Sequence, residues 1–240
     1  MRITYIDHSG FSVELDHFVL LFDYYQGTLP DFPRGKQLVV FASHKHHDHF
    51  NPKIFSLTES NPGAVYLLSR EIRIPARGKE RGEVHYLGRR AMYDYTFDGH
   101  RISVVTLRST DVGTAFLVRA DGRLIYHGGD LNWWSWKGED KSQRNNMAER
   151  YRSEIQFLEK QEPKRHHVDV AFVPLDPRLE DAYCWGMDYF LTHIDVDYVF
   201  PMHLWEQYEV IRTYKEREES RAWQDKIMEI DHPGQEFRLP

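Results

Sequence analysis

The chain has 240 residues, of which 41% are hydrophobic and 14% aromatic, so it can bury a substantial core and is expected to fold as one domain, residues 1–240. Its net charge of −6 disfavours nucleic acid as a partner, and the lack of a run of about 20 apolar residues or of a leader pattern favours a cytoplasmic protein with no membrane contact. The single cysteine, Cys184, excludes an internal disulfide and a thiolate cluster, so any metal must be held by imidazole and carboxylate groups.

Short runs rich in β-branched and aromatic residues dominate the first half of the chain and predict strands. The predicted strands are residues 2–7, 12–15, 18–23, 38–43, 64–68, 84–87, 91–97, 101–108, 114–119 and 124–127. The pair Asp121-Gly122 lies between the last two runs and is typical of a hairpin turn. The middle of the chain is therefore predicted to be strongly β.

Helices are predicted at two places. Residues 52–59 follow Asn51, a helix-capping residue, and begin with Pro52, which is favoured at the first helical position. Residues 147–161 place apolar side chains on one face at helical spacing. Both helices interrupt a chain that otherwise reads as strands.

The last third of the chain adds two short strands, at residues 168–173 and 198–201. The charged stretch 206–229 is predicted to form one or two surface helices. Helices and strands interleave, and some strands alternate in polarity whereas others are continuously apolar. Sheets packed against one another with helices outside are therefore expected.

A polar run rich in imidazole groups follows the apolar strand that ends near residue 42. His44, His46, Asp48 and His49 offer four nitrogen and oxygen donors within six residues, where a buried strand emerges from a sheet. Zinc and related divalent ions prefer such donors. A solvated polar loop is the alternative, but such loops seldom concentrate imidazoles at a strand end. The run therefore predicts a metal site.

Two later strands also end in a candidate ligand. Asp130 follows a diglycine after the strand 124–127, and His203 follows the strand 198–201. Taken singly, Asp130 is as readily a turn or capping residue, and His203 a core histidine. In combination with the first run, they favour a shared metal centre.

The order HxHxDH, then a glycine–aspartate pair after a strand, then a late PMH resembles the metallo-β-lactamase superfamily. The opening IDHSGFSVEL and the segment LLFDYY, which contains Asp23, also resemble the first strands of that superfamily. Within it, the chain is most similar to stand-alone hydrolases related to L-ascorbate-6-phosphate lactonase. The resemblance implies an α+β fold, a four-layer αββα sandwich of the metallo-β-lactamase type, with metal ions between the loop ends of the two sheets.

The resemblance also implies which ligand serves which ion. The implied ligands are, for the first ion, His44 and His46, for the second, Asp48, His49 and His203, and, bridging the two, Asp130.

The superfamily normally supplies one more histidine to the first ion, from a loop before the bridging acid, and this chain has none there. The corresponding residues 107–113 contain Ser109 at the matching position and Asp111 as a substitute oxygen ligand. Without that imidazole the first site is weaker. We therefore expect one or two divalent ions, with zinc favoured and manganese as the alternative.

This ligand set suits hydrolysis. A divalent ion lowers the pKa of bound water from about 15.7 towards about 7 and polarises the electrophile, so no protein nucleophile is needed. Asp48 is the expected orienting group or proton acceptor for that water. The substrate is expected to be a small anionic ester, lactone or phosphoester, with Trp133, Trp134 and Arg178 as candidate contacts. The tryptophans are equally compatible with a local core, and an isolated arginine is usually solvated.

Two other functions stay open on the sequence. A degenerate relative would bind a metal or a ligand without turnover, in keeping with the missing histidine. An RNA or DNA phosphodiesterase would share the metal run, but it would require a basic surface or an added domain.

Overall fold

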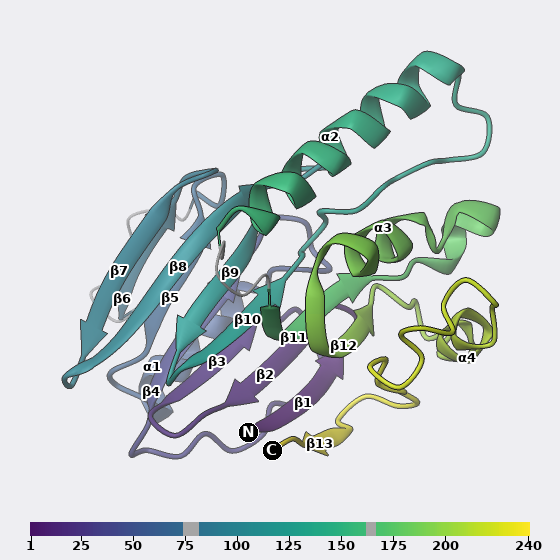
Figure 1. The fold of residues 1–240 in the computed structure, drawn as a ribbon. Coiled ribbons are helices and arrows are strands. Elements are labelled where there is room, and N and C mark those ends of the chain that lie inside the picture. Colours follow the sequence, from purple (N-terminus) through teal and green to yellow (C-terminus); the bar gives the residue numbers. More distant parts are fainter. Residues whose placement is uncertain (74–81, 162–166) are drawn as a thin grey trace.

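The computed structural model describes residues 1–73, 82–161 and 167–240, and in them two β-sheets lie face to face (Figure 1). The first sheet contains β1 (Arg2–Asp7), β2 (Gly10–Glu14), β3 (Phe18–Phe22), β4 (Gln37–Ala42), β5 (Val65–Ser69), β6 (Glu83–Leu87) and β13 (Glu236–Arg238). The second contains β7 (Met92–Phe97), β8 (His100–Arg108), β9 (Thr114–Ala120), β10 (Arg123–His127), β11 (His167–Pro174) and β12 (Asp195–Met202). The strand orders are β13-β1-β2-β3-β4-β5-β6 and β12-β11-β10-β9-β8-β7.

Aromatic and aliphatic side chains fill the space between the two sheets. The rings of Phe11 on β2 and Phe172 on β11 have centroids 4.3 Å apart, so the sheets are in direct contact. Strand β3 is buried throughout, because the other sheet covers one of its faces and a 3-10 helix, Pro52–Ser56, covers the other. Burial on both faces explains why this strand is continuously apolar and does not alternate.

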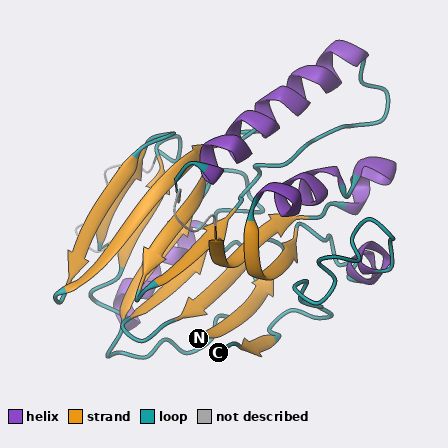
Figure 2. Ribbon diagram, viewed as in Figure 1, coloured by secondary structure: helices purple, strands orange, loops and turns teal. Residues whose placement is uncertain are grey.

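Helices cover the outer faces of both sheets, which makes four layers (Figure 2). Helices α2 (Lys141–Glu159) and α3 (Trp185–His193) pack on the second sheet, where the rings of Tyr126 and Phe190 stack with centroids 5.1 Å apart. The 3-10 helix and the short α1 (Leu57–Ser60) cover the first sheet. The predicted αββα sandwich is therefore confirmed.

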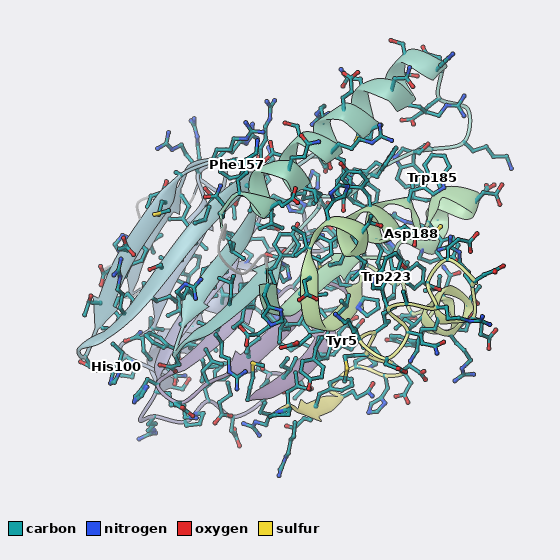
Figure 3. All side chains as sticks on the ribbon, viewed as in Figure 1. Tyr5, His100, Phe157, Trp185, Asp188 and Trp223 are labelled. Carbon is teal, nitrogen blue, oxygen red and sulfur yellow. The ribbon has the colours of Figure 1, made fainter. Side chains whose placement is uncertain are left out.

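The C-terminal region is held to α3 through Asp188 (Figure 3). This carboxylate accepts hydrogen bonds from Tyr214 Oη at 2.7 Å and from Arg217 Nη1 at 3.0 Å. The charged stretch forms one short helix, α4 (Glu209–Lys215), and then mostly turns and loop, so it is less helical than predicted. Throughout the described ranges, every helix is too short or too polar to cross a bilayer.

Two helices differ from the sequence prediction. Helix α2 begins at Lys141 and not at residue 147, because Asp140 and Gln143 form a reciprocal capping box. Its first turns are exposed and carry no apolar stripe, so periodicity does not reveal them. The sequence does not predict α3, whose aromatic residues are more typical of a strand.

Chemically reactive residues follow the ends of strands at one edge of the sandwich. Strands β3 and β4 run parallel, as do β10, β11 and β12, so the carboxyl ends within each set meet. The residues beyond these ends are Asp23 after β3, His44 after β4, Asp130 after β10, Asp176 after β11 and His203 after β12. His8 follows β1, which runs in the same direction as β3 because both are antiparallel to β2. Two backbone hydrogen bonds join the sheets there, from the N–H of Thr114 to the carbonyl of Ser43 at 3.0 Å and from His203 to His8 at 3.2 Å.

Candidate metal centre

Histidine and aspartate side chains converge at this edge in two groups, and within each group the donor atoms all lie within 4.8 Å of one another. The buried group consists of His8, Asp48, His49 and His203. The half-exposed group consists of His44, His46, Asp111 and Asp130. The structure thus brings together every residue that the sequence predicts as a metal ligand, and His8 joins them.

Asp130 belongs to the half-exposed group but also faces the buried group. Its Oδ2 is 3.3 Å from Nε2 of His44, in the half-exposed group. Its Oδ1 is 3.0 Å from Nε2 of His49 and 3.3 Å from Nε2 of His203, in the buried group. One carboxylate oxygen therefore faces each group, which is the arrangement that a bridging ligand requires.

The converging atoms are buried and lack hydrogen-bond partners. Within the described residues, this holds for Nε2 of His8, His44, His49 and His203 and for Oδ1 of Asp130. A buried polar group without a partner costs about 1–3 kcal/mol, and such groups are rare in native proteins. Several electron-pair donors that face one another without partners fit a cation that would bind them all.

Hydrogen bonds around the buried Asp23 set the tautomer of two candidate ligands. Ser43 Oγ donates its proton to Asp23 Oδ2 at 2.6 Å. Ser43 Oγ therefore acts as the acceptor for Nδ1 of His44, at 2.9 Å. Asp23 Oδ2 also accepts from Nδ1 of His49 at 2.8 Å. With the proton on Nδ1, each imidazole directs the lone pair of Nε2 into the site.

Asp176 orients His203 in the same way. Its Oδ2 accepts from Nδ1 of His203 at 2.8 Å, and its Oδ1 accepts from Nε of Arg178 at 2.9 Å. Burial alone would raise the pKa of Asp176, but the hydrogen bonds from His203 and Arg178 lower it to about 2. The carboxylate is therefore ionised and fixed behind the imidazole.

Charges across the site shift the pKa values of its members. Burial disfavours a charged His49, but Asp130 and Asp23 raise its pKa well above the usual value. Burial would raise the pKa of Asp130, but His49 and His203 hold it well below the usual value. His8 behaves differently, because burial and the imidazoles of His203 and His49 lower its pKa to about 2 and keep its ring neutral.

Asp111, the candidate substitute ligand, lies in the half-exposed group beside His46. Its Oδ2 lies 3.6 Å from Nδ1 of His46, and both side chains are 44% exposed. Ser109, the residue expected to match, is buried, and its Oγ accepts a hydrogen bond from the N–H of Asp111 at 3.1 Å, so it shapes the turn. Gly113, with φ of +78°, lets this turn approach the ligand run, because a Cβ there would collide with the carbonyl oxygen of Ser43.

A pocket of about 290 Å³ opens beside both groups, and its lining includes Asp48, Trp134 and Arg178. The ring of Trp134 stacks on that of Trp136 with centroids 6.1 Å apart. Two of the three candidate substrate contacts, Trp134 and Arg178, therefore line this pocket. Trp133 does not, because its ring packs against α3 and the side chains of α2 on the outer side of the second sheet.

Two histidines near the ligands are not part of either group. The side chain of His47 is 91% exposed. His127 is buried, and both of its nitrogens are used, because Nε2 donates to the carbonyl of Ser9 at 2.9 Å and Nδ1 accepts from the N–H of Gly129 at 3.2 Å. Neither side chain therefore offers a free donor atom to the two groups.

The sequence does not predict His8 or Asp176 as site residues, or the orienting role of Asp23. Each of these residues lies at the end of a predicted strand or within about three positions beyond it. The same signal identifies Asp130 and His203 in the sequence. Applied uniformly to every predicted strand, it would find all of them.

Two mixed sheets flanked by helices, with ligands gathered at one edge around a shared aspartate, define a metallo-β-lactamase fold. Residues 2–144 match the family model of the beta-lactamase superfamily domain, and the chain belongs to this family. The matched residues include every member of the two groups except His203. Asp176 and Arg178 also lie beyond the match.

Known proteins agree with this assignment. A UPF0173 metal-dependent hydrolase from Opitutus terrae is 32% identical over 144 residues, which cover 54% of this chain and 63% of that relative. The structure resembles Igni18, a metallo hydrolase from Ignicoccus hospitalis, with a TM-score of 0.65, 18% identity and coverage of 100% and 99% of the two chains. It also resembles CmlA, a diiron beta-hydroxylase from Streptomyces venezuelae, with a TM-score of 0.63, 12% identity and coverage of 99% and 54%. Because both sequence identities are low, the likeness to these two solved structures shows a shared fold and does not show a shared function.

Proposed function

We propose that this protein is a metal-dependent hydrolase that acts on a small anionic ester, lactone or phosphoester. The observation that carries the proposal is the position of Asp130, whose two carboxylate oxygens face two separate ligand groups beside one pocket. A shared carboxylate of this kind would hold two cations close enough to act on one bond.

The residues present fit divalent ions. Buried donor atoms without partners face one another, and imidazole and carboxylate groups suit zinc, manganese and iron. When bound, such ions activate water and polarise the oxygen of an electrophile. The residues that would hold them are His44, His46 and Asp111 in the half-exposed group, Asp48, His49 and His203 in the buried group, and Asp130 between them.

Asp48 is the residue that we assign to proton handling. It belongs to the buried group, yet it also lines the pocket, and its side chain is 15% exposed. A carboxylate at this position can orient a water molecule towards a substrate and accept its proton. Cys184 is unsuited to nucleophilic attack, because burial raises its pKa to about 11 and keeps the thiol protonated.

Arg178 supports an anionic substrate. Its Nε and Nη2 bind Asp176, and its guanidinium carbon lies 4.1 Å from the ring centroid of Trp205, so the group is fixed at the pocket wall. These bonds leave Nη1 for a carboxylate or phosphate oxygen of the substrate. Trp134 and Trp136 would contact the less polar part of the same molecule.

The size of the pocket narrows the substrate class. A volume of about 290 Å³ is at the small end of the usual range for ligand sites, which favours a small molecule over a polymer. The resemblance to L-ascorbate-6-phosphate lactonase makes a phosphorylated lactone the first substrate to test. CmlA, which shares the fold and is a diiron protein, adds iron to zinc and manganese as metals to test.

The decisive experiment combines metal analysis with a substrate panel. Protein purified without chelator is analysed for bound metal, then loaded separately with zinc, manganese or iron(II) and assayed on lactones, phosphomonoesters and phosphodiesters. We expect turnover of at least one small ester, lost on chelation and restored by metal. Asp48→Asn should lower kcat by about 100-fold or more.

Lys137→Ala is the control, because Lys137 pairs with Glu180 on the surface and should not affect turnover. Turnover that survives chelation would contradict the proposal. Tight metal binding with no turnover of any ester would favour a protein that binds without catalysis. Asp111 weakens that alternative, because it supplies a donor where the family's histidine is missing.

A nucleic-acid substrate has less support. A second hollow, of about 700 Å³, lies beside the turn that carries Asp111 and is lined by several arginines. These are Arg89, Arg90, Arg108 and Arg150. Two carboxylates, Glu149 and Glu154, share this lining, and the buried Glu154 accepts from Arg90 at 3.0 Å. Backbone carbonyls accept from Arg89 and Arg150, which fixes these two side chains in place. The phosphodiester arm of the panel tests this alternative directly.

A further inference from the structure

His8 has no part in the function proposed above, although it lies among the ligands. Its ring centroid is 4.2 Å from that of His203 and 5.5 Å from that of His49. Its Nε2 lies 3.6 Å from Oδ2 of Asp48. In a five-coordinate site, two donors at about 2.1 Å from one ion are about 3.0 Å apart at 90° and about 3.6 Å apart at 120°, so this separation suits a shared cation.

The burial of His8 argues against contact with the substrate. The side chain is 3% exposed and does not line the pocket. Its Nε2 is inaccessible and has no hydrogen-bond partner in the described part of the chain. A histidine with a purely structural role would have its nitrogens satisfied, as both nitrogens of His127 are.

The backbone holds the ring of His8 in place at an energetic cost. His8 has φ of 53° and His203 has φ of 67°, a left-handed conformation that costs about 1–2 kcal/mol for a residue with a Cβ. Strain of this kind concentrates at functional sites. The N–H of His8 donates to Tyr5 Oη at 2.9 Å, and the ring of Trp205 lies edge-on to His8 with centroids 4.6 Å apart. The position is therefore defined on several sides.

We propose that His8 is a further ligand of the ion in the buried group, through Nε2, an inference that rests on the metal centre of the proposed function. Together with Asp48, His49, His203 and Oδ1 of Asp130, it gives that ion five protein donors. Metal sites closed by protein ligands are structural, whereas catalytic sites keep an open position. The ion of the buried group would therefore keep fewer positions for solvent and substrate than the ion of the half-exposed group, where the side chains of His46 and Asp111 are each 44% exposed.

The test measures metal binding and does not depend on turnover. His8→Asn is the variant of choice, because asparagine tolerates the left-handed conformation and its shorter amide does not reach as far as Nε2. His47→Asn is the matched control, since His47 lies in the same ligand run with its side chain 91% exposed. The affinities of both ions are measured by competition with a chromophoric chelator. The visible spectrum of the cobalt-loaded protein reports the donors, and thermal unfolding in chelator reports whether each variant folds.

We expect the unaltered protein to bind two ions. His47→Asn should bind each of them with the same affinity as the unaltered protein does. His8→Asn should bind the ion of the buried group at least about 10-fold more weakly than the unaltered protein does. The visible spectrum of the cobalt-loaded variant should also differ from that of the unaltered protein. Equal affinities with an unchanged spectrum would overturn the role of His8 and leave the proposed function intact. Failure of the unaltered protein to bind any metal would overturn both.

A crystal structure of the zinc-loaded, unaltered protein keeps the inference testable if His8→Asn does not fold. A distance of about 2.0–2.1 Å between Nε2 of His8 and the buried ion would support it. A water molecule between the two would overturn it.

Discussion

The buried group and the half-exposed group differ in donors and in access. In the buried group, three imidazoles meet one carboxylate, and the most exposed side chain, that of Asp48, is 15% exposed. In the half-exposed group, two imidazoles meet two carboxylates, and the side chains of His46 and Asp111 are each 44% exposed. Nitrogen donors suit zinc, and additional oxygen donors suit manganese. Two halves of one centre are therefore expected to differ in affinity and in metal preference, although they share Asp130.

Substitution of Asp130 should abolish metal binding in both groups. Asp130→Ala takes an oxygen donor from each group and leaves His49 and His203 without the carboxylate that faces them. We expect both ions to be lost, with affinities reduced more than about 100-fold, beyond the usual effect of residues that only orient ligands. Metal content measured by mass spectrometry checks this. Retention of one ion at its original affinity would contradict the bridging role.

Acidification should empty the buried group steeply. An imidazole must be unprotonated to bind an ion. Burial lowers the pKa values of His49 and His203, but Asp130 outweighs it and raises both above the usual 6.5. Protons therefore begin to compete with the ion at a pH above about 6.5. Where binding of the ion displaces two protons, the affinity of the buried group for its ion should fall by about 100-fold for each pH unit of acidification. Chelator competition measured from about pH 5 to 8 tests this, and a constant affinity of the tighter ion would refute it.

Asp176 offers a way to weaken one half alone. Asp176→Asn removes the charge that holds Nδ1 of His203, whereas Asp23 still orients His44 and His49. The affinity of the buried group for its ion should fall about 10–100-fold, whereas the affinity of the half-exposed group for its ion should change little. Asp188→Asn is the control, because it makes the same change far from the ligands, on α3. Equal weakening of both ions would show that the halves do not act separately.

We expect Asp111 to set the metal preference of the half-exposed group. Asp111→His restores an imidazole at the place where the family has one, so the half-exposed group should bind zinc about 10-fold more tightly relative to manganese. The change is expected to be modest, because the side chain is 44% exposed. Competitive loading with both metals, followed by elemental analysis, measures the ratio. An unchanged ratio would mean that Asp111 does not bind the ion.

The sequence predicts much of the fold and most of the candidate ligands, because polar residues after apolar strands are visible without coordinates. It does not decide between Ser109 and Asp111, since the choice depends on a turn closed by a hydrogen bond from the N–H of Ser109 to the carbonyl of Gly113. It also does not separate Trp133 from Trp134. These neighbours lie on the loop between β10 and α2, where the ring of Trp133 packs against that of Tyr151 and Trp134 lines the pocket. Only the three-dimensional path of each loop resolves such choices.

The indole rings beside the ligands give the protein an optical signal of its own. The ring centroid of Trp134 is 5.4 Å from that of His203, and that of Trp205 is 4.6 Å from that of His8. At such short range, an excited indole is quenched by cations with partly filled d shells, such as manganese, cobalt or iron, whereas zinc has a filled d shell. Intrinsic fluorescence should therefore follow the arrival of each ion in real time and reveal its electronic character, in unlabelled protein.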